Sequence, residues 1–257
     1  TGMQDTRLPV QAECPDCGHL VELAEARHGQ TIFTYLCTRC RHEFDVLGTM
    51  PGVPPATIIS DRFEVGRPGF SATKCLVPGV QKLIDMGVAD PKAIGLHGHS
   101  WSGDQTAFVI TETDIFAAAV AGAPVSNMTS AYSGIRWGTG LARQFQYEKS
   151  QSRIGGSLWE ARDKYIENSP VFFADRIQTP LLIMFGDVDD AVPWYQGIEL
   201  YLAMRRLEKE CHFLQYRNEP HHPKKYANKL DCTIKYKEYL DHYLKREPAA
   251  DWILSGV

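Results

Sequence analysis

The sequence predicts an α/β fold in which helices cover a mostly parallel β-sheet. From residue 71 onward, segments with apolar residues at helical spacing alternate with short apolar runs, which is the pattern of βα units. The run 180–186 is apolar throughout, as expected for a strand that is covered on both faces. The composition, 44% hydrophobic and 23% charged residues, is that of an ordinary globular protein and excludes extensive disorder.

The elements are expected in the following order along the chain. A helix over 71–87 has apolar positions Leu76, Val80, Leu83 and Ile84. It is followed by a strand over 93–98, a helix over 102–112, a strand over 115–121, a strand over 180–186, a helix over 194–208 and a strand over 212–216. An amphipathic helix over 226–245 closes the chain, with Leu230, Ile234, Leu240 and Leu244 on its apolar face. The polar, Gly- and aromatic-containing region 125–168 fits an insertion above the sheet.

The composition of the chain changes near residue 50. A Gly/Pro cluster over 48–55 is typical of a segment that joins two domains. We therefore expect a small module over 1–48, a linker over 49–63 and an α/β domain over 64–257. No run approaches the roughly 18 consecutive apolar residues of a membrane span, so a membrane is not an expected partner.

The N-terminal module holds two C-x-x-C pairs, which are separated by nineteen residues. This spacing predicts that Cys14, Cys17, Cys37 and Cys40 hold one structural Zn²⁺ ion, in a module that resembles a zinc ribbon. Strands are expected between the pairs, over 20–23 and 31–36. The alternative is two disulfides or free thiols. The absence of a recognisable secretion signal disfavours it and leads us to expect a cytoplasmic protein.

Charge disfavours nucleic acid as a partner of this module. Residues 1–48 contain four Arg, no Lys and seven acidic residues, which is the wrong sign for contact with phosphates. We expect the module to contribute stability or to bind another protein.

The segment Gly98-His99-Ser100-Trp101-Ser102-Gly103 follows an expected strand and opens an expected helix. That context is the one a nucleophile elbow requires, since a tight turn lifts the serine hydroxyl out of the sheet. The amide of Trp101 would then face the oxyanion that develops during acyl transfer. The G-x-S-x-G pattern ends here in Ser102, and the pentapeptide alone is also compatible with a serine in an ordinary turn.

Two later loops complete the chain order Ser, Asp, His that is typical of hydrolases. An acidic loop over 186–193 follows one strand, and a loop over 217–222 with two histidines follows the next. Asp187, Asp189 and Asp190 are the available carboxylates, and His221 and His222 the available bases.

From about residue 64 to 245 the sequence resembles the C-terminal catalytic part of prolyl oligopeptidase-family serine peptidases, which have the α/β-hydrolase fold. The matching segments are 66–69, 87–91, 98–103, 169–170, 186–193, 218–221 and 241–244. In this family the catalytic Asp lies three residues after the strand-end glycine, which implies Asp189. The catalytic His lies in the Asn-Glu-x-His stretch, which implies His221.

The resemblance also implies parts that the sequence lacks. The family's sheet has several strands ahead of the nucleophile strand, and only the segments 56–60 or 62–65 could supply one here. The family's second oxyanion donor is a tyrosine, but none lies between Tyr35 and Tyr132. We therefore expect an incomplete α/β-hydrolase sheet with an exposed edge, through which two copies can pair as a homo-oligomer.

The sequence thus predicts a serine hydrolase that cleaves peptide or small ester substrates through an acyl-enzyme on Ser100. His221 would act as the base, Asp189 would orient it, and the Trp101 backbone amide would stabilise the oxyanion. The alternative is a catalytically weak or inactive hydrolase fragment that serves as a zinc-ribbon interaction module.

Overall fold

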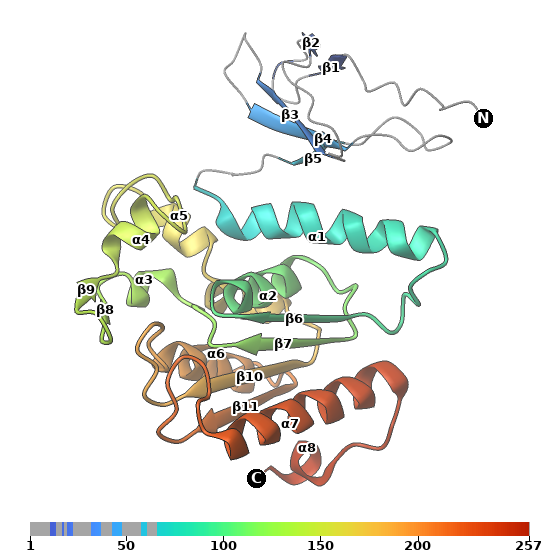
Figure 1. Cartoon of the computed structure of the whole chain (residues 1–257), viewed down its shortest axis with the longest axis vertical. Coiled ribbons are helices and arrows are strands. Elements are labelled where there is room, and N and C mark those ends of the chain that lie inside the picture. Colours follow the sequence, from blue (N-terminus) through green and yellow to red (C-terminus); the bar gives the residue numbers. More distant parts are fainter. Residues whose placement is uncertain are drawn as a thin grey trace.

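The computed structural model of the chain describes residues 66–256, residue 17 and the backbone of five short strands between residues 11 and 60 (Figure 1). Cys14, Cys37 and Cys40 of the predicted zinc site lie outside the described residues. None of the described helices combines the length and the apolar character needed to cross a membrane.

The central element of the α/β domain is a four-stranded parallel sheet with strand order β11-β10-β7-β6. Its strands are β6 (Gly95–His99), β7 (Ala118–Gly122), β10 (Leu181–Gly186) and β11 (Cys211–Tyr216). Every residue of β7 and β10 is buried, because these inner strands are covered on both faces. This arrangement confirms the α/β class with a parallel sheet.

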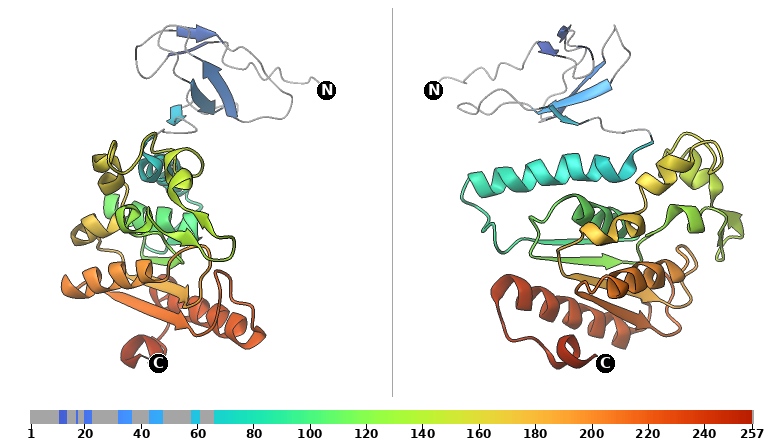
Figure 2. Two further views of the ribbon diagram at one scale, coloured as in Figure 1. Left: turned by 90° about the vertical axis from the view of Figure 1, so that its left-hand side faces the viewer. Right: turned by 180° about the vertical axis from the view of Figure 1, so that it is seen from behind.

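Helices cover the two faces of this sheet unequally (Figure 2). The helices α1 (Pro68–Asp85), α2 (Trp101–Glu112) and α6 (Tyr195–Arg206) pack with Ala119, Ala121 and Ile183 in one core cluster. The helices α7 (Tyr226–Lys245) and α8 (Asp251–Ser255) pack with the alternate strand residues, such as Val120 and Leu182, in a second cluster. Successive strand residues thus face opposite cores, as the two-residue period of a strand requires.

Two helices present a different face to the core from the one that the leucine spacing indicates. In α1, Leu76 and Leu83 are exposed, whereas Val77 and Val80 pack against the core. In α7, the expected core positions Leu230 and Ile234 are also exposed. The buried face of α7 is largely aromatic and is formed by Cys232, Tyr236, Tyr239, Leu240 and Tyr243. Tyrosines are long enough to fill the space above the sheet, and a count of aliphatic residues misses them.

The region 125–168 is an insertion, as expected, and it lies beyond the carboxyl ends of the strands (Figure 1). It contains α3 (Met128–Ala131), β8 (Ile135–Arg136), β9 (Leu141–Ala142), α4 (Gln144–Glu148) and α5 (Arg162–Glu167). The 3₁₀-helix η1 (Pro170–Arg176) leads back to the sheet. Tyr132, Tyr147 and Tyr165 are fully or almost fully buried and pack on one another, so the insertion has an aromatic core.

The N-terminal strands pair as antiparallel hairpins. The strands β1 (Gln11–Glu13) and β2 (Leu20–Glu22) pair with each other, and β3 (Ile32–Leu36) pairs with β4 (Glu43–Leu47). The strand β5 (Ile58–Ser60) pairs with β4. The expected strands over 20–23 and 31–36 therefore exist, but each pairs across its own C-x-x-C segment. Residues 58–60 of the segment 56–60, which we considered for the hydrolase sheet, pair with β4 in the N-terminal sheet instead.

Candidate active site

Ser100 occupies a strained turn between β6 and α2. Its backbone angles are φ 61° and ψ −125°, a combination that a non-glycine residue adopts only at a cost of about 1–3 kcal/mol. The turn is held by hydrogen bonds from Ser100 N to Gly122 O (2.7 Å) and from Asp104 N to Ser100 O (3.0 Å). Strain of this kind, fixed by the surrounding structure, is typical of a nucleophile elbow.

Two glycines allow the elbow to form. A Cβ atom on Gly98 would lie 2.1 Å from the carbonyl oxygen of Ser102, and one on Gly103 would lie 2.4 Å from that of Gly122. The position that departs from the G-x-S-x-G pattern, Ser102, is exposed. A hydroxymethyl group at that position therefore points to solvent, and the second close approach of the backbone is made one residue later, at Gly103.

Asp189 lies in the loop after β10 and is buried. Its Oδ1 accepts hydrogen bonds from the backbone amides of Ala191 and Val192, both at 2.8 Å. Its Oδ2 lies 2.7 Å from Nδ1 of His221. The carboxylate is thus fixed by its own loop and is directed at one ring nitrogen of the histidine, which leaves the other nitrogen, Nε2, available to the site.

The three carboxylates that the sequence left open now differ clearly. Asp187 accepts hydrogen bonds from Asn218 N at 2.6 Å and from Gln215 Nε2 at 3.2 Å, so it joins the two loops. Asp190 is exposed. Of the three, Asp189 is the carboxylate that contacts a histidine.

The loop that carries His221 is fixed by a residue to which the sequence analysis gave no role. Glu219 is fully buried, and its carboxylate accepts hydrogen bonds from Lys224 N (2.6 Å), Lys225 N (3.2 Å) and Asn228 Nδ2 (2.6 Å). The hydrogen bond from the Lys224 amide is the main cause that lowers the pKa of Glu219. The Asn-Glu-x-His stretch was the signal available in the sequence, but its glutamate acts through backbone amides that no spacing rule reveals.

Gly186 brings the two loops together. A Cβ atom at this position would lie 2.1 Å from the carbonyl oxygen of Glu219, so any larger residue would push the histidine loop away from Asp189. A glycine is therefore required at the end of this strand for steric reasons, since it allows Asp189 to pair with His221.

The structure places Ser100, Asp189 and His221 at the carboxyl ends of β6, β10 and β11, respectively. It joins Asp189 to His221, whereas the hydrogen bonds of the described residues include none between Ser100 and His221. Trp101 is the first residue of α2, so its amide has no partner within the helix and remains available to an anion near Ser100.

His99, His221 and His222 form a cluster of three imidazoles. The ring centroid of His99 lies 4.9 Å from that of His221 and 4.5 Å from that of His222. The pKa of His99 is lowered to about 4, mainly because the ring is buried and also because His221 and His222 lie beside it. His99 is therefore neutral near pH 7. The sequence analysis gave His99 no role, because its proximity to a loop about 120 residues later has no local signal in the sequence.

Asp104 lies one turn after Ser100 in α2 and is almost completely buried. Its Oδ1 has no hydrogen-bond partner among the described residues. Burial raises the pKa of this carboxyl well above its usual range. The desolvation of the charged form thus outweighs the attraction that a helix N-terminus offers to a carboxylate.

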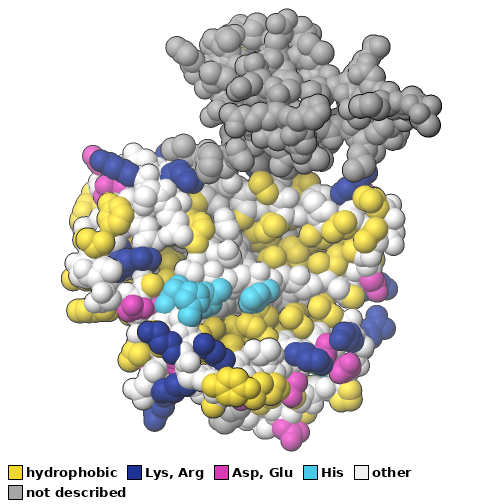
Figure 3. Space-filling model, viewed as in Figure 1, with side chains coloured by type: hydrophobic (Ala, Val, Ile, Leu, Met, Phe, Trp, Pro, Cys, Tyr) yellow, Lys and Arg dark blue, Asp and Glu magenta, His cyan; other side chains and the backbone are white. Residues whose placement is uncertain are grey.

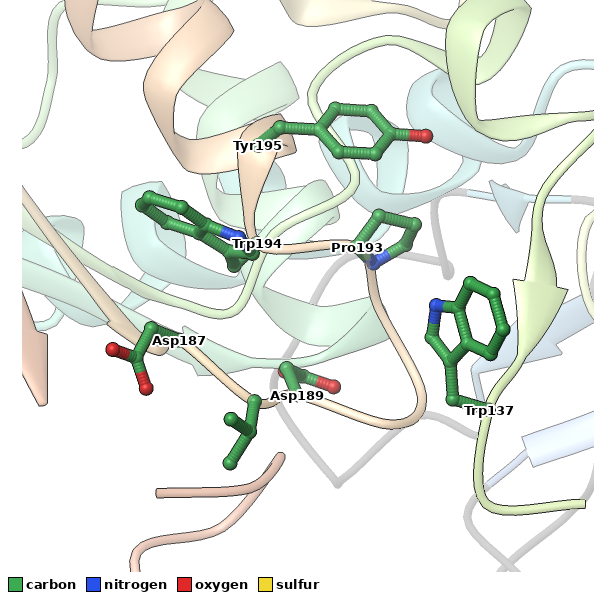
Figure 4. A pocket seen from close by; sticks show the side chains of 7 residues that line it. Trp137, Asp187, Asp189, Pro193, Trp194 and Tyr195 are labelled. Atoms are coloured by element: carbon green, nitrogen blue, oxygen red, sulfur yellow. The ribbon is translucent and has the colours of Figure 1, made fainter. Parts of the chain in front are cut away.

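A cavity of about 390 Å³ adjoins Asp189 (Figure 4). It is lined by Trp137, Asp187, Val188, Asp189, Pro193, Trp194 and Tyr195. Trp137 comes from the connection between β8 and β9, so the insertion forms part of the wall. The lining includes neither Ser100 nor His221, and the cavity therefore lies beside the predicted reaction centre.

These features agree with what the chain is similar to. The sequence profile of the prolyl oligopeptidase family matches residues 73–247, which is more than half of the chain. The chain therefore belongs to the prolyl oligopeptidase family, a family of serine peptidases with an α/β-hydrolase catalytic fold.

Particular relatives include an uncharacterised peptidase, YuxL, of Bacillus subtilis strain 168, which is 28% identical over 148 residues, 55% of this chain and 21% of that protein. The acylamino-acid-releasing enzyme of Arabidopsis thaliana is 29% identical over 163 residues, 61% of this chain and 20% of that enzyme. The chain thus spans about a fifth of the length of these relatives.

Solved structures show the same fold. A puromycin-hydrolysing peptidase of Mycobacterium tuberculosis matches with a TM-score of 0.63 and 26% identity, over 72% of this chain and 27% of that one. An acylaminoacyl peptidase of Pyrococcus horikoshii matches with a TM-score of 0.62 and 22% identity, over 74% of this chain and 31% of that one.

Proposed function

We propose that this chain is an acylaminoacyl-peptidase-like serine hydrolase that cleaves peptide or small ester bonds through an acyl-enzyme on Ser100. The observation that carries the proposal is the 2.7 Å contact between Asp189 and His221, in the chain order that follows a strained serine elbow. In such a triad the histidine takes the proton of the serine, and the carboxylate fixes its tautomer and stabilises the imidazolium.

The roles of the three side chains follow from their surroundings. Asp189 already receives two backbone hydrogen bonds on Oδ1, so its other oxygen is held in place for His221 Nδ1–H. His221 Nε2 would accept the proton of Ser100 once a substrate orders the site, since such contacts are often long in free enzymes. The Trp101 amide at the start of α2 would stabilise the oxyanion of the tetrahedral intermediate.

A fluorophosphonate probe tests the assignment of the nucleophile. The probe should label the full chain at one serine, and Ser100→Ala should abolish that labelling. Ser102→Ala is the matched control, because Ser102 lies two residues away on the exposed side of the elbow and should leave most of the labelling intact. Equal labelling of the Ser100→Ala variant would contradict the assignment, and peptide mapping would identify the serine that reacts instead.

One observation favours the second candidate, a weakly active or inactive hydrolase fragment that acts as an interaction module. The edge strand β6 is exposed at Gly95 and His97, next to the nucleophile, and in the described sheet it pairs with β7 alone. A hydrolase whose nucleophile strand is an open edge can bind a further strand there, including one from a second copy. A protein that resists the probe but elutes as a stable dimer would favour this candidate.

We also propose that the N-terminal module holds a structural Zn²⁺ ion through Cys14, Cys17, Cys37 and Cys40. The strand register supports this proposal. Glu13 pairs with Leu20 and Leu36 pairs with Glu43, so each C-x-x-C segment connects the two strands of one hairpin. Two such hairpins supply four thiolates for a tetrahedral site, which would contribute folding free energy to a module with little core of its own.

The zinc proposal has its own measurement. Mass spectrometry under native conditions should show one tightly held Zn²⁺ per chain, and Cys14→Ser should lose it. Cys75→Ser, which removes a thiol from α1, is the matched control and should keep the ion. Hydrolysis should survive the loss, because the proposed reaction uses no metal. A purified protein that is folded over residues 1–48 without metal would contradict the proposal.

A further inference from the structure

The three histidines beside Ser100 have a geometry that neither the hydrolase mechanism nor the zinc ribbon uses. His99 ends β6, and His221 and His222 follow each other in the loop after β11. One ring nitrogen from each of the three lies within 4.8 Å of the other two. Figure 3 shows histidine side chains gathered on one face of the molecule.

The nitrogens are available as ligands. His221 uses Nδ1 for Asp189, so its Nε2 is directed away from the carboxylate. Nε2 of His99 is buried and has no hydrogen-bond partner among the described residues. His222 is exposed, so its ring can rotate toward the other two. In a tetrahedral zinc site with Zn–N bonds of 2.0–2.1 Å, ligand nitrogens lie about 3.3 Å apart. The three nitrogens would therefore have to move closer together to bind an ion, and rotation of the exposed His222 ring is the movement that would do this.

The surroundings of the cluster also fit a metal ion. A histidine that ligates a metal usually donates its other ring N–H to a carboxylate, which fixes the ring and raises the basicity of the ligand. Asp189 already provides this arrangement for His221. Imidazole ligands select transition ions such as Zn²⁺ over Mg²⁺ and Ca²⁺, which prefer oxygen.

We propose that His99, His221 and His222 bind one Zn²⁺-type ion, separate from the cysteine module, and that this ion inhibits the enzyme by occupying His221 Nε2. The inhibition follows from a conflict of roles, because the nitrogen that would accept the proton of Ser100 cannot also donate its lone pair to a metal. The binding itself stands on the cluster geometry alone. The inhibitory consequence rests on the proposed serine-hydrolase function.

Zinc binding can be measured without any substrate. The full chain is first equilibrated with a zinc buffer that keeps a four-thiolate site filled, and Zn²⁺ is then titrated by calorimetry. Wild-type protein should bind one further equivalent, and His222→Ala and His99→Gln should each weaken that affinity by at least about 10-fold, the lower end of the range seen when even a supporting group is lost. His242→Ala, which removes an imidazole from α7, is the matched control and should bind as wild type does. Unchanged affinity in both cluster variants would overturn the site.

Inhibition is measured by labelling of Ser100 with the fluorophosphonate probe, each variant being compared with itself with and without Zn²⁺. Wild-type labelling should fall in Zn²⁺ and return on addition of a chelator, whereas labelling of His222→Ala should respond much less. Zinc that binds in calorimetry without slowing the labelling would overturn the inhibitory role. If no variant is labelled even without zinc, the hydrolase proposal fails, while the calorimetric titration still decides the metal site.

Discussion

The two ends of the catalytic constellation differ in how firmly the protein holds them. At the β10–β11 end, Asp189, Asp187 and Glu219 accept at least seven hydrogen bonds between them, and the two loops are in close backbone contact at Gly186. At the β6 end, Ser100 is strained, and atoms of the neighbouring side chains of His99 and Asp104 have no partner in the described part of the chain. The base and its orienter are thus prepared in advance, whereas the nucleophile end has unused polar groups and an exposed strand.

The largest effect on activity is expected from a substitution at the β10–β11 end of the site. Asp189→Asn keeps the shape of the side chain but can present an amide N–H group to His221 Nδ1 in place of a carboxylate oxygen. This favours the histidine tautomer that cannot act as the base. In a serine triad this change lowers kcat by about 10⁴. Steady-state hydrolysis of a p-nitrophenyl ester measures it, and Asp190→Asn in the same loop is the control that should retain activity. A loss of less than tenfold in Asp189→Asn would show that His221 is not the base.

A smaller effect on the rate is expected at the β6 end of the site, where the oxyanion would be stabilised. Within the described residues, the Trp101 amide is the group at the elbow that can stabilise an oxyanion, and removal of one such donor costs about 10²–10³ in rate. An activated ester should therefore be cleaved with an initial burst of product. Turnover of a matched amide should be slower, by more than the poorer leaving group of the amide explains. Comparable kcat/KM values for the two substrates would reveal a second donor.

The smallest expected effect concerns stability. Because burial raises the pKa of Asp104 above its value in the unfolded chain, the folded state holds a proton that the unfolded state has released between those two pKa values. The contribution of Asp104 to the unfolding free energy of the wild type should therefore fall as pH rises above about 4. Asp104→Asn removes this penalty, so the variant should be more stable than the wild type at pH 8 and close to it at pH 3.

Urea unfolding at the two pH values measures the difference. Asp114→Asn, at an exposed position just after α2, is the control and should not change the pH dependence. A lower stability of Asp104→Asn at pH 8 would show that the ionised carboxylate is stabilised by a group near it.

Much of the fold was predictable because it depends on local patterns. The apolar runs at 180–186 and 212–216 became β10 and β11, and the Gly98–Gly103 segment became a turn with the backbone angles of an elbow. The buried faces of α1 and α7 were harder to predict from the sequence. Valines and tyrosines form their contacts with the core, whereas several of their leucines are exposed.

The site was predictable in part, for a physical reason. Asp189 and His221 each follow a strand, and parallel strands end at the same edge of a sheet, so their meeting follows from topology. The histidine cluster needs β6 to approach the loop after β11 in space, and Glu219 acts through amides of residues five and six positions later. Neither relation has a spacing that a sequence pattern can show. The catalytic roles, the zinc module, its cytoplasmic setting and homo-oligomer formation stay predictions.

Trp137 stands in the wall of the cavity beside Asp189 with 76% of its surface exposed. An indole so open to water emits fluorescence at long wavelength, and contact with an apolar group shifts that emission to shorter wavelength. A molecule entering the cavity would cover this ring and also contact Trp194. The protein therefore carries an intrinsic optical reporter of occupancy at this place, and a Trp137→Phe variant isolates its signal from those of the other tryptophans.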